Sequence, residues 1–343
     1  MQASVTSGST RTARSRRSAR STSTARGGID LGGTKIEAVV VDSRNQVIGS
    51  SRQPTPTTGG PEAVAGQIVR AMTEAAEGAK LGPSRLHGVG VGSPGIIDVS
   101  TGAVSSARNL PDWEGSYELG AVLSEQLGTP VFVGNDVQVA TDAEFKLGAG
   151  KPYKSLLGVF WGTGVGGGII LDGKPWLGRG GAGEIGHMVV KIDGARCPCG
   201  RRGCLEAYAG RGAMEARARR RVEKGHKTEL FKLMEERGRT RLTSAVWARA
   251  VKHGDKLAVE LIDNAVRALG AGIASAVNLL DVEAVVIGGG LGVRFGAPFA
   301  GRISKAMHPH LFHDESPPDV RVASLGDLGG AIGAALLARQ ARS

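Results

Sequence analysis

Cysteine and aromatic residues are scarce in this chain of 343 residues, and long hydrophobic runs are missing. Its only three cysteines lie between positions 197 and 204, which excludes a disulfide framework and indicates a reducing compartment. No apolar run has the length of a membrane-spanning helix, so we expect a cytoplasmic protein without a membrane partner. Hydrophobic residues still make up 41% of the chain, as is typical of a globular protein.

Acidic residues are absent from positions 1–26, which contain six arginines. Removing these six charges from the net charge of +11 leaves +5 for the remaining chain. The segment has twelve serines and threonines and almost no large apolar side chains, so we expect a disordered tail. An organelle transit peptide is the alternative interpretation. No basic surface is evident in the rest of the sequence, and we therefore expect no nucleic-acid partner.

Glycine is abundant, with 54 residues, and it separates alternating strand and helix patterns. Strands are predicted over residues 36–42, 88–92, 131–133, 156–161, 169–171 and 284–287, and helices over 62–80, 117–127, 136–147, 255–280 and 329–339. The basic segment 219–253 is expected to be a solvated helical surface. Residues 29–45 and 159–174 share the order strand, Gly-Thr turn, strand and Asp-led turn, which predicts two related α/β lobes.

Three glycine-rich turns could bind phosphate through converging backbone N–H groups. They are residues 32–35, 162–168 and 288–290. The chain has no Walker G-x-x-x-x-G-K-[ST] run, so a P-loop nucleotidase is not expected. G-x-G-x-x-G matches at 90–95 and 162–167 precede strand patterns instead of helices, and we interpret both as false matches. Any one turn alone is equally well explained as a simple hairpin, whereas two opposed turns would hold a triphosphate from both sides.

The cysteine cluster has the spacing of a metal site. Cys197, Cys199 and Cys204 follow His187, which precedes the first of them by ten residues. Three thiolates and one imidazole complete a tetrahedral zinc site that leaves no position for a reactive water. We therefore expect a structural zinc ion, and three buried free thiols are the alternative.

Asp136 is the candidate catalytic carboxylate. It follows a short apolar strand and begins a predicted helix, where the simplest role of an aspartate is to cap the helix. The same position is also the carboxyl end of a strand, where open α/β sheets bind their ligands. Phosphoryl transfer to an alcohol needs a carboxylate beside the nucleophilic hydroxyl. The two roles are compatible with each other.

Over about residues 27–341 these motifs resemble the ROK family of repressors and sugar kinases. Residues 197–206, CPCGRRGCLE, match the family's CxCGxxGCxE signature at every fixed position. Residues 30–35 and 162–168 resemble its two phosphate motifs, and residues 183–187 its GEIGH segment. The resemblance implies an α/β, two-lobed actin/hexokinase-like (ribonuclease H-like) fold with a cleft between the lobes. The small lobe would comprise residues 27–140 and the final helix at 327–341, and the large lobe residues 141–326 with the zinc loop.

The family further implies ATP-dependent phosphorylation of a hexose, with glucose as the first choice, in a homodimer or homotetramer. Asp136 would deprotonate the sugar 6-hydroxyl. Sugar contacts are implied for Asn109, Asn135, Asp136, Glu184, His187 and Glu206. Nucleotide contacts are implied for Asp30, Gly32, Gly33, Thr34, Lys35, Gly162, Thr163, Gly164, Gly166, Gly167, Gly288, Gly289 and Gly290. Mg²⁺ would lie near Asp30, and His187 would ligate zinc through one ring nitrogen and contact sugar through the other.

Several alternatives share these motifs. A kinase for N-acetylmannosamine, N-acetylglucosamine or fructose would carry the same residues, and polyphosphate could replace ATP. A sugar-sensing regulator is a third possibility, but residues 1–26 are too short for the winged helix of the family's repressors. Arg108 stands where relatives often have proline, which affects the placement of Asn109.

Overall fold

The structure, a computed structural model, describes residues 24–107, 110 and 112–340. Nearly all of the predicted tail therefore lies outside the described residues, and so does Asn109. Strand β1 begins at Arg26, whose side chain is buried. Ala25 is buried as well, and its carbonyl accepts a hydrogen bond from the N–H of His87 at 2.9 Å, so the last two residues of the predicted tail belong to the folded part.

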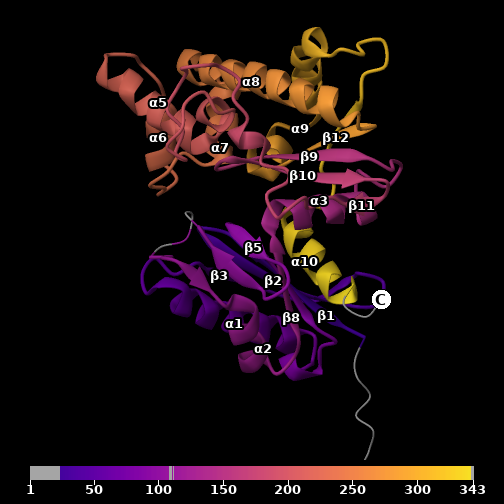
Figure 1. The fold of residues 1–343 in the computed structure, drawn as a ribbon. Coiled ribbons are helices and arrows are strands. Elements are labelled where there is room, and N and C mark those ends of the chain that lie inside the picture. Colours follow the sequence, from indigo (N-terminus) through magenta and orange to yellow (C-terminus); the bar gives the residue numbers. More distant parts are fainter. Residues whose placement is uncertain (1–23, 108–109, 111, 341–343) are drawn as a thin grey trace, which may run out of the picture.

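The smaller lobe is built on a five-stranded sheet in the order β3-β2-β1-β4-β8. Its strands are β1 (Arg26–Leu31), β2 (Lys35–Val41), β3 (Val47–Pro54), β4 (Val89–Ser93) and β8 (Val131–Asn135). Strands β1, β2 and β3 are antiparallel neighbours, whereas β1, β4 and β8 run parallel. Helices α1 (Gly60–Gly78) and α2 (Leu119–Leu127) cover one face (Figure 1). A small second sheet contains β5 (Ile96–Asp98), β6 (Ala103–Ser105) and β7 (Ser116–Tyr117).

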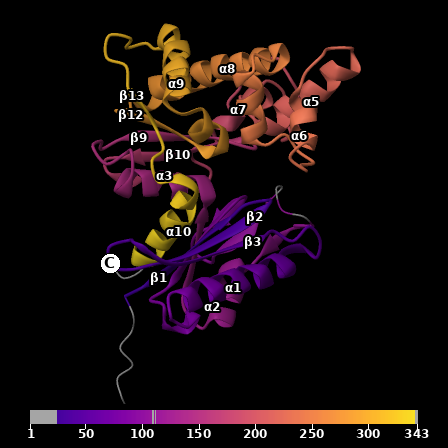
Figure 2. The same ribbon diagram turned by 180° about the vertical axis from the view of Figure 1, so that it is seen from behind.

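The larger lobe is built on the sheet β11-β10-β9-β12-β13. Its strands are β9 (Leu156–Trp161), β10 (Val165–Leu171), β11 (Lys174–Pro175), β12 (Ala284–Gly288) and β13 (Asp319–Val322). Its helices are α4 (Glu206–Ala209), α5 (Arg211–Glu223), α6 (Leu230–Glu235), α7 (Ser244–Lys252), α8 (Lys256–Leu280) and α9 (Gly289–Met307). Seen from behind, α8 and α9 lie on one side of this sheet and α3 on the other (Figure 2).

Both sheets have the same topology. In each, the first strand pairs antiparallel with the second and parallel with the fourth. The fifth strand is parallel to the fourth in both lobes. This shared order confirms the internal duplication predicted from residues 29–45 and 159–174, and with it a two-lobed α/β architecture.

Two helices cross between the lobes (Figures 1 and 2). Helix α3 (Asp136–Leu147) follows β8 of the smaller lobe but packs on β9 and β10 of the larger one. Helix α10 (Gly329–Gln340) follows β13 but packs on β1 and β4, and the two helices contact each other. The proposed lobe boundary at residue 140 falls inside α3, and the proposed final helix corresponds to α10. The division of the chain between the lobes stays a proposal.

Close packing against these helices accounts for several glycines. A Cβ on Gly90 would lie 1.7 Å from the carbonyl oxygen of Ala334 in α10. A Cβ on Gly158 or Gly168 would lie 2.3 or 2.2 Å from Oγ1 of Thr141 in α3. Strand β10 begins at Val165, so Gly166 and Gly168 are strand residues. The predicted loop over residues 162–168 is therefore too long, because glycine at these positions is explained by packing.

The basic segment 219–253 is more than a solvated surface. It forms the end of α5, then α6 and α7, and it buries Leu230, Leu233, Leu242 and Trp247 in the core of the larger lobe. The prediction of a purely solvated surface is wrong for these side chains, although most of the arginines and lysines of the segment are at least partly exposed. In the described part of the chain, none of the helices combines the length and apolarity that crossing a membrane requires.

Candidate functional site

Two predicted site residues, Asp30 and Asp136, meet at one edge of the smaller sheet. Asp30 is paired with Gly92 in the parallel β1–β4 ladder, and Gly92 with Gly134 in the β4–β8 ladder. The carboxyl ends of these strands therefore lie side by side, where parallel sheets expose ligand-binding residues. The rejected dinucleotide match at 90–95 belongs here, and strand β5 follows it, which confirms that rejection.

Asn135 caps helix α3, and Asp136 is the first residue of the helix. The side-chain Oδ1 of Asn135 accepts hydrogen bonds from the backbone N–H groups of Val137 and Gln138, each at 3.1 Å. The interpretation of Asp136 as the cap is therefore wrong. Because the neighbouring amide fills that role, Asp136 only accepts one bond from the N–H of Val137, at 2.9 Å. Most of its acceptor capacity is left for a ligand.

The environment of Asp136 makes it a better proton acceptor than a solvated aspartate. Burial, followed by the negative charges of Asp30 and Glu184, raises the pKa of Asp136 to about 7. Burial also raises the pKa of Asp30. A carboxylate with a pKa near neutrality is suited to general-base chemistry at physiological pH.

His187, Cys197, Cys199 and Cys204 come together as predicted. Their ligand atoms all lie within 4.8 Å of one another, and none of the cysteines is in a disulfide. Sγ of Cys199 is 3.7 Å from Sγ of Cys204, and Sγ of Cys197 is 3.9 Å from Nδ1 of His187. Tetrahedral zinc with bonds of about 2.3 Å would separate two sulfur ligands by about 3.8 Å. The four residues therefore fit a structural zinc ion.

His187 presents its two ring nitrogens to different neighbours. Nδ1 faces the cysteines, whereas Nε2 lies 3.9 Å from Oε2 of Glu184. Glu184 is well exposed, and it also contributes to the raised pKa of Asp136. Glu184 therefore connects the candidate metal cluster with Asp136, and the outer nitrogen of His187 stays available to a ligand.

Glu206 links the metal segment to the second glycine turn. It begins α4, two residues after Cys204, and its Oε2 accepts a hydrogen bond from the N–H of Val165 at 2.9 Å. A Cβ on Gly164 would lie 2.1 Å from the same oxygen. The sequence assigned Glu206 only to sugar, and the structure adds this contact with the turn.

The first glycine turn connects β1 and β2. The N–H of Gly32 donates to the carbonyl of Lys35 at 3.0 Å, and Oγ1 of Thr55 donates to the carbonyl of Gly32 at 2.6 Å. Gly33 and Thr34 are exposed at its tip. Lys35 forms an ion pair with Glu37, a buried carboxylate that also pairs with Arg52.

The other two predicted turns lie next to each other in the larger lobe. The β9–β10 turn is closed by the N–H of Gly162, which donates to the carbonyl of Gly164 at 3.0 Å. A Cβ on Gly162 would lie 3.8 Å from the backbone N of Gly290, at the start of α9. Gly289 has φ of 76° and packs on the carbonyl of Trp161, so glycine is required there. Thr163 is exposed at the tip of the turn, and Gly166 and Gly167 lie in β10.

Arg211 and Ser244, which no sequence motif marks, also lie at the second glycine turn. One terminal nitrogen of Arg211 donates to Oγ1 of Thr163 at 2.7 Å, and the other donates to Oγ of Ser244 at 3.2 Å. The backbone N–H of Arg211 also donates to the carbonyl of Gly162 at 3.1 Å. No motif marks these residues, because their proximity to the turn depends on how α5 and α7 pack.

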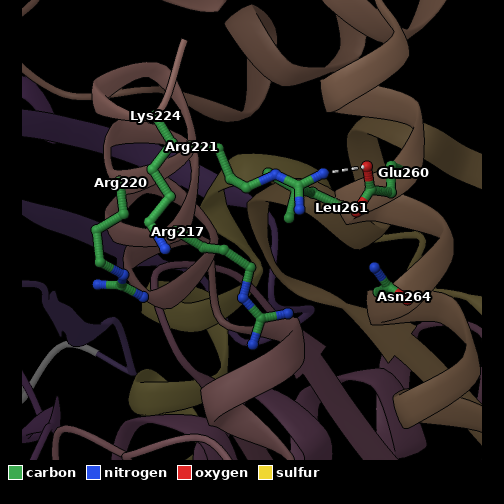
Figure 3. Close-up of a pocket in the computed structure, with 7 residues that line it drawn as sticks. All are labelled: Arg217, Arg220, Arg221, Lys224, Glu260, Leu261 and Asn264. Carbon is green, nitrogen blue, oxygen red and sulfur yellow. Dashed lines mark hydrogen bonds and ion pairs between the residues drawn. The ribbon is translucent and has the colours of Figure 1, made fainter. Parts of the chain in front are cut away.

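Two hollows lie away from these contacts. One, of 580 Å³, lies between the lobes, where the small sheet around Ile96 and Ala103 faces residues 177–180. The other, of 360 Å³, lies between α5 and α8 (Figure 3). It is lined by Arg217, Arg220, Arg221, Lys224, Glu260, Leu261 and Asn264. The only carboxylate in this second lining is that of Glu260, which is paired with Arg221 at 2.9 Å.

Comparison with known proteins identifies relatives over nearly the whole chain. A sequence model of the ROK family matches residues 26–341. A glucokinase of Streptomyces coelicolor is 35% identical over 317 residues, which are 91% of this chain and 97% of the relative. An N-acetyl-D-glucosamine kinase of Erwinia tasmaniensis is 32% identical over 327 residues, 90% of this chain and 98% of the relative.

Among solved structures, a ROK family glucokinase from Streptomyces griseus, in complex with glucose and AMPPNP, has a similar fold. Its TM-score is 0.79 at 34% sequence identity, and the match covers 92% of this chain and 99% of that one. The predicted fold class is thereby confirmed.

Proposed function

Because the chain belongs to the ROK family, we propose that it is an ATP-dependent sugar kinase that phosphorylates a hexose at its 6-hydroxyl. Glucose is the first candidate substrate, supported by the similarity to the Streptomyces glucokinases. The observation that carries the proposal is Asp136, a partly exposed carboxylate at the carboxyl edge of a parallel sheet with a pKa of about 7.

In the proposed reaction the hydroxyl of the sugar donates a hydrogen bond to the carboxylate of Asp136. As the oxygen attacks the terminal phosphorus, the proton passes to this carboxylate, and ADP leaves on the opposite side. A group that is half ionised near pH 7 can accept this proton and release it again after product dissociation. Asn135, fixed as the helix cap, holds the beginning of α3 and so sets the direction of Asp136.

Sugar recognition is proposed for the polar groups next to Asp136. Glu184, the Nε2 of His187, and the oxygen of Glu206 that does not bind Val165 are hydrogen-bonding groups of the kind that select hydroxyls. Asn135 and Asn109, which lies outside the described residues, are two further proposed sugar contacts. A zinc ion bound by His187 and the three cysteines would fix the orientation of the histidine ring.

The phosphates are proposed to bind between the turn at residues 32–35 and the turn at residues 162–164, with adenosine near residues 288–290. Asp30 is the carboxylate best placed to hold Mg²⁺, which would neutralise charge on the transferred phosphoryl group. Its position beside Asp136, whose pKa it raises, supports this assignment, because two close carboxylates favour a bound cation.

A kinase for an N-acetylated hexose is the second candidate, favoured by the similarity to the Erwinia enzyme over 98% of its length. An ADP-release assay over glucose, N-acetylglucosamine, N-acetylmannosamine and fructose, with ATP and then polyphosphate as donor, distinguishes these substrates. Because polyphosphate releases no ADP, its reaction is followed instead by measuring the sugar phosphate that forms. Sugar binding without turnover of any donor would indicate a sensor and would contradict the proposal.

The role of Asp136 is tested in the same assay with Asp136→Asn. Loss of the base should lower kcat by about 10²–10⁴-fold while sugar still binds, as measured by calorimetry. Asp172→Asn is the matched control, because Asp172 is exposed in a turn with φ of 50°, a conformation that asparagine also adopts. A near-normal kcat for Asp136→Asn would show that another group accepts the proton.

A further inference from the structure

Arg211 is a partly buried cation without a carboxylate hydrogen-bond partner in the described part of the chain. Its guanidinium donates hydrogen bonds to the hydroxyls of Thr163 and Ser244. Glu215 is the acid nearest along α5, but its oxygens already accept bonds from Arg219, Arg241 and the N–H of Leu242. Burial and the charge of Arg241 lower the pKa of Arg211, and the charge of Glu215 opposes them only in part.

The position of Arg211 is equally informative. Ser244 begins α7, and a Cβ on Gly290 would lie 2.9 Å from its Oγ. Arg211 therefore stands where the β9–β10 turn, the start of α7 and the start of α9 meet. A second guanidinium is close by, because a Cβ on Gly212 would lie 3.8 Å from a terminal nitrogen of Arg241.

Charge is distributed unevenly around the proposed site. Asp30, Asp136 and Glu184 form the acidic side, where the charges of Asp30 and Glu184 raise the pKa of Asp136. Arg211 and Arg241 lie on the side of the second turn, where the carboxylate of Glu206 accepts a hydrogen bond from the N–H of Val165. In the first turn, the ammonium of Lys35 is already paired with Glu37. A phosphate chain bound at the second turn would therefore find its uncommitted positive charge at Arg211.

We propose that Arg211 binds a phosphate group of the nucleotide at the β9–β10 turn, on the side of the leaving ADP. This inference rests on the proposed function. Two of the five guanidinium N–H donors are sufficient for Thr163 and Ser244, so others can bind phosphate oxygens in the planar geometry typical of arginine. The hydroxyl contacts hold the guanidinium in place before the nucleotide arrives, which reduces the entropy lost on binding.

The test compares the affinities of Arg211→Met and Arg211→Lys for adenosine, AMP, ADP and AMPPNP, measured by calorimetry. If Arg211 binds phosphate, Arg211→Met should bind ADP and AMPPNP about 10- to 100-fold more weakly, with little change for adenosine. Arg211→Lys should recover part of the loss, since it keeps the charge without the fork. The matched control is Arg220→Met, on the face of α5 that lines the distal hollow (Figure 3).

Each outcome bears on the inference. Equal losses for adenosine and ADP would show that Arg211 only supports the turn, and unchanged ADP binding would show that it has no role; both overturn the proposal. A wild-type protein that binds ADP but phosphorylates no sugar would refute the proposed function alone. The role of Arg211 would still be tested by the ADP affinities of the wild type and of Arg211→Met. Failure of the wild type to bind any nucleotide would refute both.

Discussion

The two lobes share one sheet topology, but they hold their glycine turns in different ways. In the smaller lobe the turn at residues 32–35 is closed by its own backbone and by Thr55, the residue that follows β3. In the larger lobe the turn at residues 162–164 is also held by Glu206 and Arg211, which belong to the long segment between β11 and β12. The same sheet topology therefore positions two different turns. One is held by residues closer to it in sequence, and the other is held by residues of a distant segment.

The proposed function assigns most of the sugar recognition to the part of the fold that the two lobes do not share. The shared strands place the turns and the carboxyl edges, whereas the inserted segment of the larger lobe contributes the metal cluster, Glu184, Glu206 and Arg211. Glu206 is bonded to the turn and lies two residues from a metal ligand. We therefore expect metal, sugar and nucleotide contacts to depend on one another in the larger lobe and to be more independent in the smaller one.

The largest expected effect is on the stability of the fold, at the glycines of the two sheets that pack against helices α3 and α10. Gly90→Ala would place its Cβ 1.7 Å from a backbone oxygen of α10, which cannot rotate away. We expect a loss of about 3 kcal/mol or more in the free energy of unfolding. Gly158→Ala instead meets the Thr141 side chain at 2.3 Å, so it should cost less.

Urea denaturation of both variants measures this difference between the lobes. Thr141→Ala should reduce the cost of Gly158→Ala, which a double-mutant cycle detects, and it should leave the cost of Gly90→Ala unchanged. Equal costs for the two glycine variants would contradict the distinction between a backbone and a side-chain neighbour.

The next effect concerns the metal. Cys204→Ser should remove zinc and raise the KM for sugar by about 10- to 100-fold, because His187 and Glu206 lose their fixed positions. Metal analysis of protein purified without chelators should give about one zinc per wild-type chain. Ile192→Ser, at an exposed position in the same segment, is the control. A Cys204→Ser protein with full zinc content and normal sugar KM would refute the site.

Much of this arrangement was predictable from the sequence, and the exceptions have physical reasons. Apolar periodicity located β9, α8 and α10 within a few residues, and the spacing of the cysteines predicted their cluster. The sequence predicts a loop at Gly166, which lies in β10 against α3. From local sequence alone, a glycine that allows a helix to pack closely cannot be distinguished from one that forms a turn. Asn135 and Asp136 are adjacent and cap helices equally well, so only the fold shows which one is the cap. Arg211 depends on tertiary packing alone.

The smallest expected effect is on the pH dependence of the acidic side. Burial, then Asp30 and then Glu184 raise the pKa of Asp136 to about 7, so kcat/KM for sugar should rise with pH and level off above this value. Removing a neighbouring negative charge should lower that pKa and move the rise to lower pH, more in Asp30→Asn than in Glu184→Gln.

The raised pKa of Asp136 also affects stability. The folded protein keeps the Asp136 proton between about pH 4 and 7 while the unfolded chain has lost it, so this group makes stability fall as pH increases across that window. Urea unfolding of Asp136→Asn should show a weaker fall. If the pH profile of kcat/KM hardly moved in either charge variant, burial alone would set the pKa of Asp136. The acidic residues would then act independently of one another.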